Sequence, residues 1–139
     1  MKWAEILKMR QAARLTSATK RHNHKESNIQ QNAVTWFRLQ YPQLSKVLIA
    51  VPNGGRRGKI EACIMKAEGV VAGAADMLLL TPRGNYGALC IEFKTETGRQ
   101  SPKQKEWQEA AEKAGNKYVI VRSEEEFMAE IREYLEQNQ

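Results

Sequence analysis

Three charged residues lie in two segments that otherwise have an apolar, strand-forming character. Asp76 begins the segment 76–80, and Glu92 and Lys94 lie at the end of the segment 88–94. If these segments pair as an antiparallel hairpin that is symmetric about the intervening loop, Asp76 lies opposite Glu92. Because strand side chains alternate, Lys94 then lies on the same face as Glu92. The sequence therefore predicts two carboxylates and one ammonium group on one side of a sheet.

Such a group of charges has a definite chemistry. Two close carboxylates repel each other, and a charge within an apolar strand is costly unless it is paired or bound to a metal. Oxygen ligands from Asp and Glu favour a hard cation such as Mg²⁺ or Mn²⁺, which keeps several of its water ligands. One of those water molecules can act as a nucleophile, and Lys94 can orient it or stabilise charge on a phosphate. The set Asp76, Glu92 and Lys94 thus fits metal-assisted hydrolysis of phosphodiesters.

An ordinary structural interpretation of the same residues stays open. Glu92 and Lys94 can form an ion pair on one face of an edge strand, while Asp76 merely begins its own strand. The neighbours Ile91 and Phe93 are expected to point the other way, into the core, under either interpretation.

The composition favours one folded domain with a polyanionic partner. The chain has 139 residues, 42% of them hydrophobic, and a formal net charge of +6. No apolar run approaches the roughly 20 residues that span a bilayer, and none resembles a signal peptide, so we expect a cytoplasmic protein without a membrane partner. We expect Cys63 and Cys90 to be small buried apolar residues rather than a disulfide or metal ligands.

Hydrophobic spacing and capping signals predict the order of the elements. Helices are predicted over 2–15, 25–39 and 60–68, with a polar linker at 16–23. Strands are predicted over 47–51, 76–80, 88–94 and 118–121. Ser101 and Ser123 each open a capping box, and therefore begin two further helices. Helices that alternate with short strands in this way are typical of an α/β or α+β sandwich.

This ordered series of motifs resembles the PD-(D/E)xK nuclease superfamily and, more narrowly, the virus-type replication-repair nuclease (VRR-NUC) domain family in its small stand-alone form. The resemblance is carried by Glu26, Asn53-Gly54-Gly55, Met65 to Gly69, Gly73 to Asp76, Ile91 to Lys94 and Ser101 to Trp107. It implies an α/β fold with a restriction-endonuclease-like core, in which helices flank a small mixed β-sheet. It also implies a nuclease domain at 24–139, preceded by a helical and basic N-terminal extension at 1–23.

The resemblance further implies an endodeoxyribonuclease that depends on Mg²⁺ or Mn²⁺. Asp76 and Glu92 would be metal ligands, and Lys94 would be the catalytic lysine. Glu26 would be a further acidic residue that reaches the metal from its helix. Gln104 would reach the site from the start of the helix that follows Lys94.

Two of these residues also have structural interpretations. Gln104 stands where the capping-box partner of Ser101 belongs, and Glu26 can be a solvated glutamate that favours the helix dipole. The family usually has proline before the aspartate, where this chain has Ala75. Because proline only stiffens the backbone at that point, we expect Asp76 to keep its role.

The segment after the first predicted strand combines glycines with cations. Glycines let backbone N–H groups approach phosphates, and Asn53, Arg56, Arg57 and Lys59 are therefore predicted DNA-binding residues. A basic turn without a ligand is the alternative. No segment resembles a base-reading recognition helix, so we expect recognition through the DNA backbone and its shape.

The resemblance also implies branched DNA, such as a Holliday junction, as the substrate. Cutting both strands of a symmetric junction needs two sites related by a two-fold axis, which a homodimer provides. The segment around Trp3, Ile6 and Leu7 is a candidate dimer element. Two alternatives stay open: a catalytically inactive nuclease fold that binds DNA as an accessory protein, and a nuclease that acts on flaps, single strands or RNA.

Overall fold

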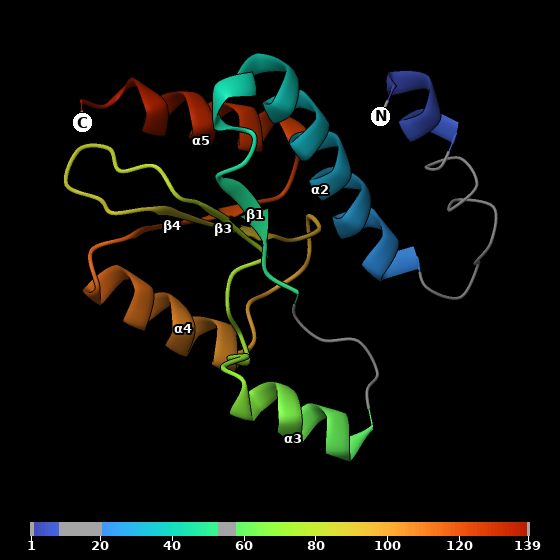
Figure 1. The fold of residues 1–139 in the computed structure, drawn as a ribbon, viewed down its shortest axis with the longest axis vertical. Helices are drawn as coiled ribbons and strands as arrows, with labels where there is room; N and C mark the ends of the chain where they lie inside the picture. Colours follow the sequence, from blue (N-terminus) through green and yellow to red (C-terminus); the bar gives the residue numbers. More distant parts are fainter. Residues whose placement is uncertain (1, 9–20, 53–57, 139) are drawn as a thin grey trace.

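The protein is a three-layer sandwich in which a mixed sheet lies between helices (Figure 1). The computed structural model describes residues 2–8, 21–52 and 58–138, and side chains from residue 24 onward in the second of these ranges. The strands are β1 (Leu48–Ala50), β2 (Met77–Leu79), β3 (Leu89–Phe93) and β4 (Lys117–Val121). The helices are α2 (Arg21–Gln40), α3 (Lys59–Ala67), α4 (Pro102–Lys113) and α5 (Glu124–Glu136), with a 3₁₀ turn η1 (Pro42–Leu44) and a helical turn at 3–8.

The sheet has the strand order β1-β2-β3-β4, so that β3 is paired on both sides. β1 with β2 and β2 with β3 are antiparallel, whereas β3 with β4 is parallel and is connected through α4. Met77 lies opposite Ile91, which is the register of a hairpin symmetric about its loop. The predicted mixed sheet and the predicted register of the hairpin are therefore confirmed.

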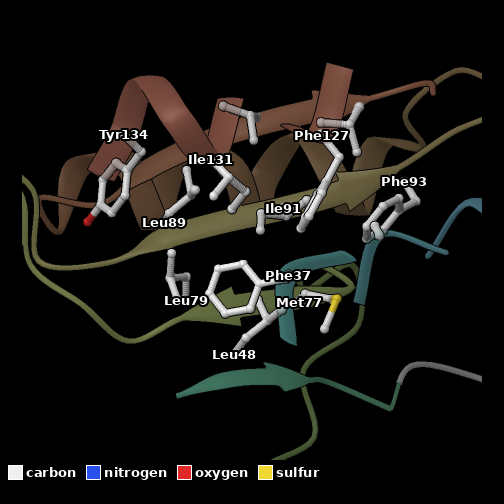
Figure 2. Packing of buried hydrophobic residues seen from close by; sticks show 13 residues of the cluster. Phe37, Leu48, Met77, Leu79, Leu89, Ile91, Phe93, Phe127, Ile131 and Tyr134 are labelled. Carbon is white, nitrogen blue, oxygen red and sulfur yellow. The ribbon is translucent and has the colours of Figure 1, made fainter. Parts of the chain in front are cut away.

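Side-chain alternation divides the sheet into two faces. On the face covered by α2 and α5, the odd-numbered residues of β3 (Leu89, Ile91 and Phe93) pack with Phe37 and Phe127 in the main core (Figure 2). On the other face, Cys90 packs with residues of α4 and β4 in a smaller cluster. The prediction that Ile91 and Phe93 point away from Glu92, into the core, is confirmed. Glu92 is consequently directed to the side of α4.

The N-terminus of α4 has the predicted capping box. The Ser101 hydroxyl accepts a hydrogen bond from the Gln104 N–H, and the Gln104 side chain accepts one from the Ser101 N–H. At α5 only half of the predicted box forms. Ser123 accepts from the Glu126 N–H, but the Glu126 carboxylate accepts from the N–H of Arg122 instead of Ser123. The extended backbone of Ser123 presents the preceding N–H group to that carboxylate.

Two expectations from the sequence, on the start of α2 and on Cys63, were wrong. Helix α2 begins at Arg21, inside the predicted linker, so its first turn forms without an apolar pattern and although His22 and Asn23 are weak helix formers. Cys63 is exposed, unlike the buried Cys90. No residue of α3, all of which the structure describes, is buried, and Ile60 is 77% exposed. The predicted helix is present, but its apolar residues belong to neither of the two core clusters of the described chain.

None of the described helices combines the length and the apolar character that a membrane span requires.

Gly73 brings the segment before β2 into contact with the start of α4. Its φ is +84°, in the left-handed region that favours glycine. A Cβ atom at this position would lie 2.4 Å from the carbonyl carbon of Lys103 and 2.8 Å from the backbone nitrogen of Gln104. Only a hydrogen atom fits there, and this close approach places Asp76 near the first turn of α4.

We predict that Gly73→Ala lowers the free energy of unfolding by about 3 kcal/mol. A left-handed alanine costs about 1 kcal/mol, and the contact with the α4 backbone adds about 2 kcal/mol. Urea titration measures the loss. The matched control is Gly69→Ala, because Gly69 also has a left-handed φ, +105°, but has open space around it, so a loss of about 1 kcal/mol is expected there. Equal losses in the two variants would contradict the proposed constraint.

Candidate active site

Asp76 lies immediately before β2 and is fixed by both neighbouring strands. Its carbonyl oxygen accepts a hydrogen bond of 2.8 Å from the Val51 N–H. Its carboxylate Oδ2 accepts one of 2.7 Å from the N–H of Phe93, the residue that follows Glu92 in β3. The Asp76 side chain thus continues the β2–β3 pairing beyond the end of the strand. It is held beside Glu92 while Oδ1 keeps its acceptor capacity.

Glu92 is an acidic residue in β3, an interior strand of the sheet, and only 2% of its surface is exposed. Both oxygens of its carboxylate accept hydrogen bonds. The amide nitrogen of Gln104 donates to Oε1 at 2.9 Å, and the hydroxyl of Tyr118 donates to Oε2 at 3.3 Å. Buried acceptors with suitable donors avoid most of the cost of desolvation, so the position is built to hold a polar side chain.

The pKa of the Glu92 carboxyl is raised from 4.5 to about 8, and the largest cause is burial. The charge of Asp76 and a side-chain hydrogen bond between the two carboxyl groups contribute to this rise, whereas Lys94 and the Tyr118 hydroxyl oppose it. Repulsion between two close carboxylates in an apolar setting is what a divalent cation would relieve. The all-oxygen donor set of Asp76 and Glu92 therefore fits a hard cation such as Mg²⁺ or Mn²⁺.

Lys94 follows β3 and is half-buried, and its N–H donates to the carbonyl of Val121 at 3.0 Å. Its ammonium group lowers the pKa of Glu92, which places it within electrostatic reach of the carboxylate. However, the ion pairs within 4 Å between described residues do not include Lys94. The alternative interpretation, in which Glu92 and Lys94 form an ion pair on an edge strand, does not hold, since β3 is an interior strand.

Gln104 satisfies both of its predicted interpretations at once. Its Oε1 accepts the Ser101 N–H at 2.8 Å, as a capping residue does, and its Nε2 donates to Glu92. Since a backbone N–H can only donate, the cap fixes the orientation of the amide group and directs its NH₂ toward the carboxylate.

Other predicted site residues lie apart from this pair or outside the described residues. Glu26 is half-buried on α2. Among the described residues, no three His, Cys, Asp or Glu side chains lie close enough together to hold a metal, so Asp76 and Glu92 meet without Glu26. Lys59 is exposed at the first position of α3. Asn53, Arg56 and Arg57 lie outside the described residues.

Sequence reasoning did not identify Tyr118, whose hydroxyl contacts Glu92, or Gln100, which donates to that hydroxyl at 3.2 Å. A signal for Tyr118 was available. A strand that follows β3 through a helix is expected to pair parallel to it, and alternate residues of β4 then face the same side as Glu92.

Comparison with known proteins shows to which family this chain belongs. The VRR-NUC domain model matches residues 10–125. The chain belongs to the VRR-NUC domain family. A solved structure titled "VRR_NUC domain protein" is similar, with a TM-score of 0.73 and 26% sequence identity over 83% of this chain and 91% of that chain. A search among curated proteins gave no match.

Membership of the VRR-NUC family has two consequences for this chain. The sheet and its flanking helices are the restriction-endonuclease-like core of PD-(D/E)xK nucleases, as expected from the sequence. The function of the domain is of the nuclease type. The predicted aspartate and the Glu-x-Lys triplet are the residues that the structure brings together at the end of the β2–β3 hairpin.

The pH dependence of stability follows from the buried carboxyl group. Between pH 4.5 and about 8, folded Glu92 keeps a proton that the unfolded chain has lost. We therefore predict that, in EDTA, the free energy of unfolding falls as the pH rises through this window, by at most about 1.4 kcal/mol per pH unit. Urea titrations at several pH values measure the slope.

The comparison variant for this prediction is Glu92→Gln, which has no titrating carboxyl group and is expected to remove the slope. Glu106→Gln, at an exposed position of α4, is the control and should leave the slope unchanged. A wild-type stability that rises with pH across this window, or a slope that survives in Glu92→Gln, would contradict the assignment.

Proposed function

We propose that this VRR-NUC domain is a Mg²⁺- or Mn²⁺-dependent endonuclease that hydrolyses phosphodiester bonds in DNA. The observation that carries the proposal is the meeting of the Asp76 and Glu92 carboxylates, on neighbouring strands, with the Lys94 ammonium group in electrostatic reach. Burying these groups together costs free energy, and hydrolysis of a polyanion would use each of them.

Each residue has a definite part in this proposal. Asp76 and Glu92 would hold the cation, which when bound supplies positive charge to the phosphate and makes water a better nucleophile. Lys94, which is outside the described ion pairs, would donate to a phosphate oxygen or to the attacking water. Gln104 keeps the Glu92 carboxylate oriented.

The surroundings of Lys94 support binding of a nucleic-acid backbone. The loop directly after it, 95–97, lines a hollow together with residues 25–29 of α2, and the cations Lys25 and Arg122 outnumber the acidic Glu96 on its walls. Cations beside a phosphodiester site neutralise neighbouring phosphates without reading bases. This arrangement and the net charge of +6 support recognition through the backbone.

We further propose branched DNA as the substrate and a homodimer as the active form. One pair of facing carboxylates in the described chain can hydrolyse one DNA strand at a time. Paired incisions in a junction therefore need a second copy of the chain. Trp3 and Leu7, in the segment expected to contribute to the dimer, are exposed in the single chain.

We predict that Asp76→Asn, Glu92→Gln and Lys94→Ala each lower the cleavage rate at least about 100-fold, because each removes a charge from the reacting centre. DNA binding, measured by fluorescence anisotropy in Ca²⁺, should persist. The matched controls are Glu106→Gln and Lys113→Ala on the exposed side of α4, which should cut at the wild-type rate. Substantial Mg²⁺-dependent activity of Glu92→Gln would refute the assignment.

The substrate and the oligomeric state are tested together. Nicking of duplex, single-stranded, flapped and four-way DNA, and of RNA, is compared in Mg²⁺, Mn²⁺ and EDTA. We expect metal-dependent cleavage that is fastest on branched DNA, and a dimer in analytical ultracentrifugation. If the protein binds DNA but nicks none of these substrates, it is a DNA-binding accessory protein and not an enzyme. If it cleaves RNA faster than DNA, the proposed substrate is wrong.

A further inference from the structure

A chain of hydrogen bonds, part-buried at Gln100 and buried at Glu92, leads from α4 to the candidate active site. The Tyr118 hydroxyl on β4 donates to Oε2 of Glu92 at 3.3 Å. The amide nitrogen of Gln100 donates to that hydroxyl at 3.2 Å and also to Oε1 of Gln108, on α4, at 2.8 Å. Because the hydroxyl accepts from Gln100, its single proton is left for Glu92.

We infer that Tyr118 is a positioning residue, which orients the Glu92 carboxylate for a divalent cation and is itself oriented by Gln100. The inference rests on the proposed function, since it concerns the same carboxylate. A hydrogen bond from a neighbouring group to a ligating carboxylate fixes its direction and commonly changes metal affinity about 10- to 100-fold when it is removed.

The two oxygens of Glu92 are held from different directions. Gln104 donates to Oε1 from the first turn of α4, and Tyr118 donates to Oε2 from β4. A carboxylate held at one oxygen can still rotate, whereas donors at both oxygens fix its plane. Each oxygen keeps a second lone pair, which is what a cation shared with Asp76 requires.

The ring and the hydroxyl of Tyr118 make different contacts, so they can be tested separately. The ring is buried in the smaller cluster with Ala75, Cys90 and Ala111, and it packs against Trp107 with ring centroids 6.1 Å apart. A phenylalanine fills the same space and keeps these apolar contacts. The hydroxyl accepts from Gln100 and donates to Glu92, so Tyr118→Phe removes these two hydrogen bonds and keeps the packing of the ring.

The chain contains a matched control for the removal of a buried hydroxyl. Tyr134 is fully buried in the main core, and its hydroxyl donates to the carbonyl of Thr81 at 2.6 Å, on the opposite face of the sheet. Tyr134→Phe therefore reports what the loss of a buried tyrosine hydroxyl does to the fold without touching Glu92.

The experiment measures Mn²⁺ affinity of the full chain by electron paramagnetic resonance of unbound Mn²⁺, without DNA. We expect Tyr118→Phe to raise the Kd for Mn²⁺ about 10-fold or more, and Tyr134→Phe to leave it within about twofold of wild type. Cleavage by Tyr118→Phe should recover toward the wild-type rate at saturating Mn²⁺, whereas Glu92→Gln should stay inactive. A Kd of Tyr118→Phe equal to that of wild type would overturn the inference.

A second variant tests the chain of bonds if Tyr118→Phe folds poorly. Gln100→Leu keeps the tyrosine hydroxyl but removes the group that orients it, so we expect a weaker loss of Mn²⁺ affinity, about threefold or more. In a Tyr118→Phe background the same change should add nothing, because the bond it supports is gone. Full additivity, or no loss in Gln100→Leu alone, would overturn the inference. Wild-type protein that binds Mn²⁺ no better than Glu92→Gln would instead refute the proposed function.

Discussion

The carboxylate of Glu92 is buried in an interior strand of an otherwise apolar sheet, and the surrounding structure has to stabilise it there. An ionised group at such a position is unstable without donors or an opposite charge. The first turn of α4 and the start of β4 each supply a donor, and the hairpin supplies a second carboxylate beside it. A structural ion pair would have placed an ammonium group within 4 Å of the carboxylate, and the ion pairs between described residues do not include Lys94. Two carboxylates share the field of this one ammonium group, so the site keeps a deficit of positive charge, which is the property that a cation-dependent hydrolase needs.

Much of this arrangement could be predicted because it depends on local geometry. The symmetric hairpin follows from a loop between two apolar segments, and the alternation of side chains then sets Glu92 and Lys94 apart from Ile91 and Phe93. The capping box at Ser101 is equally local, since its two hydrogen bonds join residues three positions apart. Pairings of this short range can be derived from residue types and spacing alone.

The remaining features depend on contacts between distant segments. Tyr118 reaches Glu92 because β4 lies parallel to β3 after the crossover through α4, so alternation within β4 indicates the contact only once that pairing is known. The exposure of Cys63 has a similar cause. The apolar pattern of α3 predicts a buried face, but burial also requires a partner, which the described part of the chain does not provide.

Gln104 ties the assembly of the site to the end of a helix. The same amide group caps α4 and holds Glu92, so it cannot leave one partner without disturbing the other. Helix termini are the parts of a fold that open first in local fluctuations. Each opening of the first turn of α4 would therefore release an oxygen of Glu92, while the rest of the sheet stays folded. Hydrogen exchange at the Ser101 and Gln104 amides would then report how often the carboxylate loses its orientation.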